Sequence, residues 1–410
     1  MQHHTGTPSD RGRIESLDVL RGFAVLGILV MNIQAFAMVS AAYLNPTALG
    51  PLTGREWWVW LIAHVAFDGK FLALFAALFG AGLVLMADRA DAAGIAPWRR
   101  HRRRMATLAV IGAVHAYAIW YGDILLIYAV VGLFAFLFRN GSVRRLLVLA
   151  AVFYAIPVVW MLLMTAVLQV MPEVAYQEMA DLYWQPAPEV IAAQEAAYRG
   201  GWLAQMQQRV PDALTMHLVV FPTEEVWRVL ALMLAGMAAY KSGLLSGAWS
   251  ARRYRRLMLV CLSVGLPIVL VGVVHNQLAG WEMGRVMYLG ALFNHLATPL
   301  LALAWVCGAL LVIKHGVLPS LVARLACVGR AALSAYLLSS LICTLVFYGH
   351  GLGAFGQADR LEQLLVVGVV WALLLGIAPA WFRHFHMGPV EWLWRWSVYG
   401  VQPPLRRVAV

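Results

Sequence analysis

Ten apolar segments, each long enough to cross a lipid bilayer, account for most of this chain. They lie near residues 19–40, 57–87, 104–121, 123–138, 144–170, 217–241, 257–275, 287–313, 331–349 and 363–383. About 20 apolar residues form a transmembrane helix, and a lipid environment obliges the backbone to satisfy its own hydrogen bonds. Only 12% of the residues are charged, against about 25% in a typical soluble domain. The sequence therefore predicts an all-α polytopic membrane protein with about ten transmembrane helices.

The basic residues predict how these helices are oriented, because they collect in alternate connections. They are Arg11 and Arg13, five arginines between 99 and 104, Arg139, Arg144 and Arg145, four arginines between 252 and 256, Lys314 and Arg324, and Arg395, Arg406 and Arg407. Positive residues are retained in the cytoplasm, so both termini are expected on the cytoplasmic side of a bacterial inner membrane. The acid-leaning segment 171–215 then lies on the opposite side. The net charge of +11 is explained by this topology and by contact with anionic membrane lipids, and no nucleic-acid partner is expected.

The cysteines argue against a disulfide framework or a metal site, and the first apolar segment argues against a cleaved signal peptide. Cys261, Cys307, Cys327 and Cys343 lie in or beside apolar segments without CxxC spacing, which favours buried thiols over disulfides or a metal site. The first apolar segment lacks a small-residue cleavage pattern, so we interpret it as a retained helix. Glycine-rich helix faces are compatible with a homodimer.

Two polar residues, Arg21 and Asn32, interrupt the first apolar segment. Eleven residues on an α-helix are three turns plus about 20°, so both side chains lie on one stripe, about 16 Å apart. Polar groups facing lipid are costly, so this stripe is expected to face other helices or a hydrated cavity. Two structural interpretations stay open: Arg21 pairs with Asp18 near the cytoplasmic face, and Asn32 forms a hydrogen bond between helices.

The second apolar segment carries His64, Asp68 and Lys70, followed by Phe71 and a phenylalanine- and glycine-rich run. His64 and Asp68 share a helix face. Lys70 lies 200° around the helix from Asp68, so these two pair only if the helix breaks at Gly69. The Phe71 face is typical of helix packing, whereas a buried acid and base favour a functional role.

Two later segments carry further candidate residues. His115 ends the third segment and Asp123 opens the fourth; they suggest a base with an orienting carboxylate, or a core histidine and a helix N-cap. Arg330 and Ser334 share a face at the start of the ninth segment, where Arg330 is suited either to hold a phosphate or to anchor the helix. In the sixth segment, Glu224 and Arg228 have the spacing of a structural pair.

Four blocks of sequence carry a resemblance to a known family. They are Asp18-Val-Leu-Arg21-Gly with Met-Asn32-Ile, Phe67-Asp68-Gly-Lys70-Phe71 through Gly82, His115 to Gly132, and Cys327 to Tyr336 with Gly388 to Arg395. Over nearly the whole chain they resemble the bacterial YeiB family, whose members carry the DUF418 domain. The resemblance implies one integrated membrane domain, with N-terminal helices bearing the site motifs (1–250) and DUF418-like helices (251–410).

The family is similar, more remotely, to transmembrane acyltransferases, including acyltransferase-3 proteins and the lysosomal heparan-alpha-glucosaminide N-acetyltransferase. This resemblance implies transfer of an acyl group from acyl-CoA or acetyl-CoA to a small-molecule, lipid or glycan acceptor. The connection after the first segment, residues 41–56, contains no histidine, so His115 or His64 is the candidate base. The expected catalytic residues are His115, Asp123, Asn32 and Asp68. The expected substrate-binding residues are Arg21, Lys70, Phe71, Arg330, Ser334 and Tyr336. The alternative is a transporter or a lipid- or metabolite-binding protein that retains the fold without chemistry.

Overall fold

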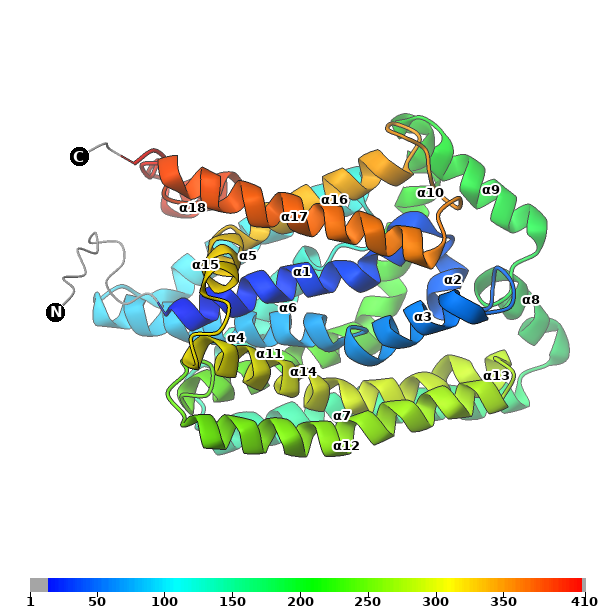
Figure 1. Ribbon diagram of the computed structural model, residues 1–410, viewed down its shortest axis with the longest axis horizontal. Helices are drawn as coiled ribbons and strands as arrows, with labels where there is room; N and C mark the ends of the chain where they lie inside the picture. The colour runs from blue at the N-terminus through cyan, green and yellow to red at the C-terminus, as the bar shows by residue number, and fades with distance from the viewer. Residues whose placement is uncertain (1–13, 408–410) are drawn as a thin grey trace.

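Helices follow one another along the whole of residues 14–407, the part of the chain that the computed structural model describes (Figure 1). The first half contains α1 (Glu15–Ala37), α2 (Ser40–Leu44), α3 (Gly54–Ala66), α4 (Lys70–Ala92), α5 (Pro97–Val114), the π-helix η1 (His115–Ile119), α6 (Leu125–Ala135), the 3-10 helix η2 (Phe136–Phe138), α7 (Val143–Val170), α8 (Glu173–Tyr183) and α9 (Pro188–Arg199). The second half contains α10 (Trp202–Thr215), the π-helix η3 (Met216–Glu225), α11 (Val226–Lys241), α12 (Ala251–Leu278), α13 (Met283–Arg285), the π-helix η4 (Val286–Gly290), α14 (Ala291–Lys314), α15 (Pro319–Arg330), α16 (Ala332–Phe347), α17 (Arg360–His384) and α18 (Pro389–Tyr399). The all-α class is confirmed.

Fewer helices than the sequence predicted are long and apolar enough to count as candidate membrane spans. Within the described residues, six helical stretches are long and apolar enough to cross a membrane, namely α1, α3 with α4, α7, α12, α13 through α14, and α17. A seventh is added if α15 and α16, bent by 89°, count as one span. The expected count of about ten is therefore not confirmed. The predicted third and fourth spans are the basic helix α5 and the short apolar stretch Leu125–Phe138.

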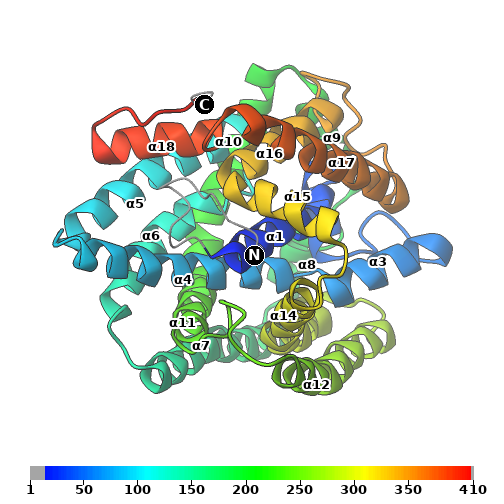
Figure 2. The same cartoon turned by 60° about the vertical axis from the view of Figure 1, so that its left-hand side comes forward.

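Helix α1 runs through the middle of the bundle and packs against α4, α15, α16 and α17 (Figure 2). Its contact with α15 is unusually close. A Cβ atom on Gly329 would lie 1.7 Å from the carbonyl oxygen of Asp18, and one on Gly22 would lie 2.1 Å from that of Leu325. Only glycine fits at these two positions, so the first and last blocks of the family resemblance meet at one helix crossing.

The bundle has two ends that differ in the helices they carry. Helix α1 begins, and α18 lies, at the end that we call the N-terminal end, whereas α8, α9 and α10 gather at the opposite, far end (Figure 1). Arg11 and Arg13, which entered the topology prediction, lie outside the described residues.

Candidate functional site

The connection between α5 and α6 brings His115 and Asp123 together. The helix widens into η1 at His115, and the chain leaves it in an extended conformation at Trp120. Nδ1 of His115 lies 2.8 Å from Oδ1 of Asp123, and both side chains are fully buried. Oδ2 of Asp123 accepts a hydrogen bond from the backbone N–H of Leu126 (2.7 Å). Asp123 therefore both caps the start of α6 and orients the imidazole of His115.

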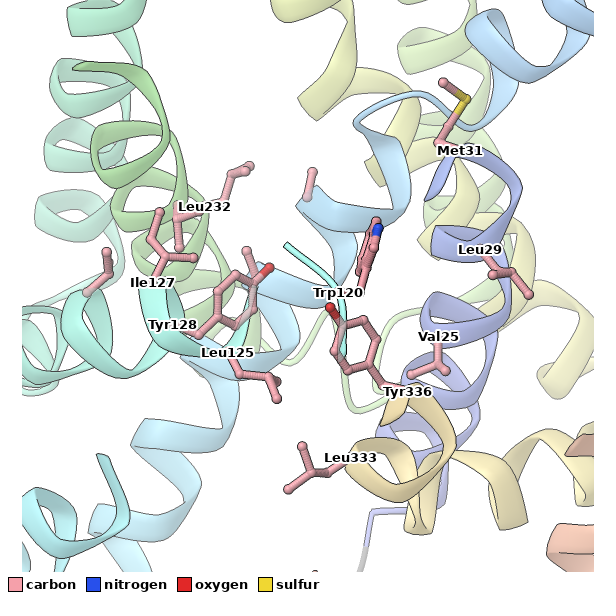
Figure 3. Close-up of a cluster of buried hydrophobic side chains, with 14 of the residues drawn as sticks. Val25, Leu29, Met31, Trp120, Leu125, Ile127, Tyr128, Leu232, Leu333 and Tyr336 are labelled. Atoms are coloured by element: carbon pink, nitrogen blue, oxygen red, sulfur yellow. The ribbon is translucent and has the colours of Figure 1, made fainter. Parts of the chain in front are cut away.

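The second ring nitrogen of His115 makes this pair chemically interesting. Nε2 is buried and has no hydrogen-bond partner among residues 14–407. The ring centroid of Tyr336, on α16, lies 5.1 Å from that of His115, and Trp120 stacks on Phe36 of α1 at 4.0 Å. Figure 3 shows Tyr128 and Tyr336 turned with their hydroxyl groups toward Trp120 inside the apolar cluster around the site. Because a buried polar atom without a partner is costly, Nε2 is poised to meet a ligand or a water molecule.

Helix α10 covers this turn from the far end through residues that the sequence analysis did not single out. Nη1 of Arg209 and Nε1 of Trp202 both donate to the carbonyl oxygen of Ala118 (2.8 Å each). Arg209 is completely buried, and its other terminal nitrogen donates to Gln205 (2.6 Å). The Ala118 carbonyl oxygen, which is left without a partner inside the π-helix, thereby accepts a hydrogen bond from the charged Arg209 guanidinium. This bond holds η1 in place.

A second histidine–aspartate pair forms where α3 gives way to α4. Gly69 adopts a left-handed conformation (φ 77°), so the helix breaks at the residue the sequence analysis named. Nδ1 of His64 lies 2.9 Å from Oδ2 of Asp68, and the same oxygen accepts from Asn294 of α14 (2.9 Å). Lys70 is fully buried and donates to the backbone oxygen of His64 (2.8 Å) and to Oδ1 of Asn294. Lys70 and Asp68 thus share Asn294 without forming a direct ion pair.

Arg228 lies near the second pair, in the interior of the bundle. Its terminal nitrogen contacts Glu225 at 2.5 Å, whereas the sequence predicted Glu224; the contacting carboxylate is three residues away, not four. Arg228 interacts electrostatically with groups on α2, the α3–α4 connection, α6, α7 and α14, namely Tyr43, Asp68, Tyr128, Tyr154 and His295.

These charged side chains remain accessible although protein surrounds them. The exposed fractions of the Asp68, Glu225 and Arg228 side chains are 24%, 23% and 25%. These partly exposed groups form one polar cluster around Arg228. We call this group of side chains the central cluster and define it by Tyr43, Asp68, Glu225 and Arg228.

Two tyrosines link the His115 pair electrostatically to the central cluster. Tyr128 interacts with Glu225 and Arg228, and Tyr336 interacts with both Tyr128 and Asp123. The hydroxyl of Tyr117 in η1 also lies 3.0 Å from Nδ1 of His217 in η3, the helix that ends at Glu225. Of the expected residues, His115, Asp123 and Tyr336 therefore lie together, whereas Asp68 belongs to the central cluster.

The other expected residues lie elsewhere or pack the core. Arg21 forms a salt bridge with Asp18 (3.1 Å), as one open interpretation predicted, and Asn32 is half-buried on α1. Phe71 is 1% exposed, and its ring packs against those of Phe23, Phe67 and Trp305. Its position favours the packing interpretation.

Ser334 fastens the bend between α15 and α16 to α18, and Arg330 fastens it to the end of α17 and the residues that follow. Ser334 donates to Glu391 (2.5 Å), which also accepts from the backbone N–H groups of Leu333 and Ser334 at the start of α16. Burial raises the pKa of Glu391 above its ordinary value, against the lowering effect of these hydrogen bonds. The Arg330 guanidinium lies 4.0 Å from the ring centroid of Phe382 and donates to the backbone oxygen of His386 (3.3 Å). These contacts give both residues a structural role.

Comparison with known proteins places this arrangement in a family. Residues 239–401 match the model of DUF418, described as a protein of unknown function. The chain is 34% identical over 387 residues to a protein described as uncharacterized protein YeiB of Escherichia coli (strain K12), covering 93% of this chain and 94% of that relative. It is 29% identical to uncharacterized protein YxaH of Bacillus subtilis (strain 168), covering 96% of each chain. The protein therefore belongs to the YeiB family of membrane proteins, whose C-terminal part is the DUF418 region.

Proposed function

We propose that the protein is an integral membrane acyltransferase that moves an acyl group, acetyl among the candidates, from cytoplasmic acyl-CoA to an acceptor. The observation that carries this proposal is the buried His115, whose Nδ1 is held by Asp123 at 2.8 Å while Nε2 has no partner. A histidine oriented in this way by a carboxylate is suited to act as a general base. Basic residues gather at the N-terminal end of the bundle, so we assign that end to the cytoplasmic side of a bacterial inner membrane.

In the proposed step, Nε2 of His115 accepts the proton of an acceptor hydroxyl or amine. The acceptor oxygen or nitrogen bonds to the thioester carbonyl carbon, the C–S bond then breaks, and the proton passes to the departing CoA thiolate. Asp123 keeps the imidazole in the required tautomer and stabilises its protonated form. Tyr336, whose ring lies beside His115, supplies a hydroxyl donor for the carbonyl oxygen as negative charge develops there.

Asn32 and the central cluster complete the proposed site. Asn32 precedes Phe36 by four residues on α1, so the two share a helix face, and Phe36 stacks on Trp120. This face of α1 is therefore turned toward the His115 pair, and we assign Asn32 to positioning the thioester. The central cluster, with the partly exposed Asp68 and the neighbouring buried Lys70, is assigned to a small-molecule, lipid or glycan acceptor.

A second candidate function, transport, is favoured by the break between α3 and α4. Discontinuous helices with charged groups at the break are typical of binding sites in secondary transporters. Here the break holds Asp68, and among residues 14–407 the fully buried Lys70 has only neutral acceptors at hydrogen-bond distance. In this interpretation, the central cluster binds a solute and His115 takes no part in covalent chemistry.

Incubation of the purified full-length protein with radiolabelled acetyl-CoA separates the two functions. An acyltransferase gives a labelled product, a labelled protein or accelerated release of CoA, and His115→Ala abolishes most of that signal without loss of thermal stability. The matched control is His101→Gln, because His101 is also buried with one ring nitrogen lacking a partner in the described part of the chain, but its bonded nitrogen, Nε2, contacts the backbone oxygen of Gly132 (3.0 Å) and not a carboxylate. Equal turnover in the His115→Ala variant would remove His115 from the mechanism, and saturable binding without turnover would support the transporter.

A further inference from the structure

Three arginines from two helices gather at the N-terminal end of the bundle, beside Arg21 of α1. Arg100 and Arg104 are four residues apart on α5 and therefore share a face, and Arg395 lies on α18. Arg104 interacts electrostatically with Arg21, Arg100 and Arg395. Arg104 therefore has like-charged neighbours on α1, α5 and α18, of which Arg21 is itself paired with Asp18.

Aromatic rings of α18 hold two of these guanidinium groups. The Arg104 guanidinium carbon lies 4.8 Å from the ring centroid of Trp394, and that of Arg100 lies 4.8 Å from the ring centroid of Tyr399. Nε1 of Trp394 donates to the backbone oxygen of Arg104 (3.1 Å). Cation–π contacts stabilise a guanidinium and leave its N–H donors available to a ligand.

The acidic groups nearby do not neutralise this cluster. Within residues 14–407, no carboxylate oxygen lies within 4.0 Å of a guanidinium nitrogen of Arg100, Arg104 or Arg395. Asp18 contacts Arg21, and Glu391 accepts from Ser334 and the start of α16. Clustered guanidinium groups with open donors match the charge and geometry of a phosphate, which they bind through paired N–H···O bonds.

We propose that Arg100, Arg104 and Arg395, with Arg21 at their edge, form a binding site for a phosphate group. As the anchor for the nucleotide phosphates of an acyl-CoA donor, this site rests on the proposed function. The same chemistry is offered by the headgroup of an anionic lipid.

The course of α1 relates this site to the His115 pair. Phe36, which stacks on Trp120, is 15 residues beyond Arg21, or about 22 Å along the helix axis. A donor anchored by its phosphates at the arginine cluster would extend its acyl arm along α1 toward His115.

Calorimetric titration of the purified full-length protein with adenosine 3′,5′-bisphosphate tests the site without requiring turnover. The double variant Arg100→Gln/Arg104→Gln should weaken binding at least tenfold. The matched control, Arg102→Gln/Arg103→Gln, removes the same charge from exposed positions of the same helix and should change the Kd less than twofold. If both double variants weaken nucleotide binding equally, the proposal is overturned, because the loss of affinity would then follow from the lower net charge alone.

A lipid arm of the experiment identifies the source of the phosphate. Native mass spectrometry after purification with phosphatidylglycerol detects retained lipid in the wild-type protein and in both double variants. If the nucleotide does not bind, but lipid is retained by the wild type and lost only in Arg100→Gln/Arg104→Gln, the phosphate site stands and the donor role fails. If neither probe distinguishes the two double variants, the site itself is wrong. His115→Ala should bind the nucleotide normally, so a failure of the proposed chemistry is seen separately.

Discussion

The two histidine–aspartate pairs use the same atoms at nearly the same distance, yet their surroundings differ. In both, Nδ1 of the imidazole faces a carboxylate oxygen, at 2.8 Å for His115 and 2.9 Å for His64. The His115 and Asp123 side chains are fully buried, whereas those of His64 and Asp68 are 16% and 24% exposed. The first pair is isolated from water and fixed by a helix start, and the second is shared with Asn294 at a helix break. The proposed assignment of His115 as the base rests on the combination of a buried Nε2 without a partner among residues 14–407 and an Nδ1 held by a buried carboxylate.

The largest expected effect is the difference in turnover between the two histidines. A positioned general base contributes about 10²–10⁴-fold to a rate, so His115→Ala should reduce acyl transfer by that range and His64→Ala by less than tenfold. Initial rates with labelled acetyl-CoA provide the measurement. A larger loss for His64→Ala would exchange the two assignments and make His64, in the partly exposed pair, the base.

Replacing each carboxylate by its amide sharpens the comparison further. Asp123→Asn preserves the shape of the side chain and its acceptor for the start of α6, but it removes the charge that stabilises a protonated His115. We expect a loss of about 100-fold in kcat, within the range of a general base, with KM little changed. Asp68→Asn should affect KM more than kcat, because Asp68 belongs to the central cluster, which we assign to the acceptor. A matching fall in kcat for both variants would contradict this division.

Asn294 provides a test of stability at the helix break. Asn294→Leu removes an acceptor from the buried Lys70 and a donor from Asp68. Hydrogen bonds to charged groups contribute about 1.5–3 kcal/mol each, so the two together should lower the free energy of unfolding by on the order of 3 kcal/mol.

Chemical denaturation in detergent gives this value for the Asn294→Leu variant. Thr298→Val, one turn later on the same helix, removes a bond only to its own helix backbone and should cost much less. If Asn294→Leu and Thr298→Val lower the free energy of unfolding by the same amount, apolar packing, and not the hydrogen bonds of Asn294, holds the break between α3 and α4.

Local spacing explains which contacts were predictable from the sequence. His64 with Asp68 and His115 with Asp123 lie four and eight residues apart, and Gly69 signalled the helix break, so the chain itself places these groups together. Asn294 and Arg209 were missed because their partners, Asp68 and Ala118, are 226 and 91 residues away. Hydropathy periodicity identifies a buried face but does not say which helix covers it.

The span count was not confirmed, for a related physical reason. Hydropathy records apolar character, but whether a short segment crosses the membrane depends on its neighbours. The stretch Leu125–Phe138 is apolar yet short, and α5 begins with a run of arginines. These two elements form a hairpin whose turn is covered by α10. A broken or partial span of this kind is stable only where protein satisfies its backbone, and here Arg209 and Trp202 do so.

The smallest expected effect concerns helix α10, which covers the His115 pair. Burial raises the pKa of Asp212 on α10, against hydrogen bonds from Tyr198 (2.6 Å) and Gln208 (2.9 Å) that lower it. The folded protein therefore binds this proton more tightly than the unfolded chain. The resulting stabilisation is fully present below the ordinary carboxyl pKa of about 4 and is lost as the pH rises through the higher folded value.

Asp212→Asn should abolish this pH dependence, so relative to that variant the wild-type protein gains stability between pH 7 and pH 4. Each unit of pKa difference is worth about 1.4 kcal/mol, which sets the scale of the change. Thermal unfolding at the two pH values measures it, with the exposed Asp181→Asn on α8 as the control that should follow the wild type. A constant difference in Tm between wild type and Asp212→Asn would show that the Asp212 carboxylate is as well solvated under the cover as in the unfolded chain, and the isolation of the His115 pair from water would then need another cause.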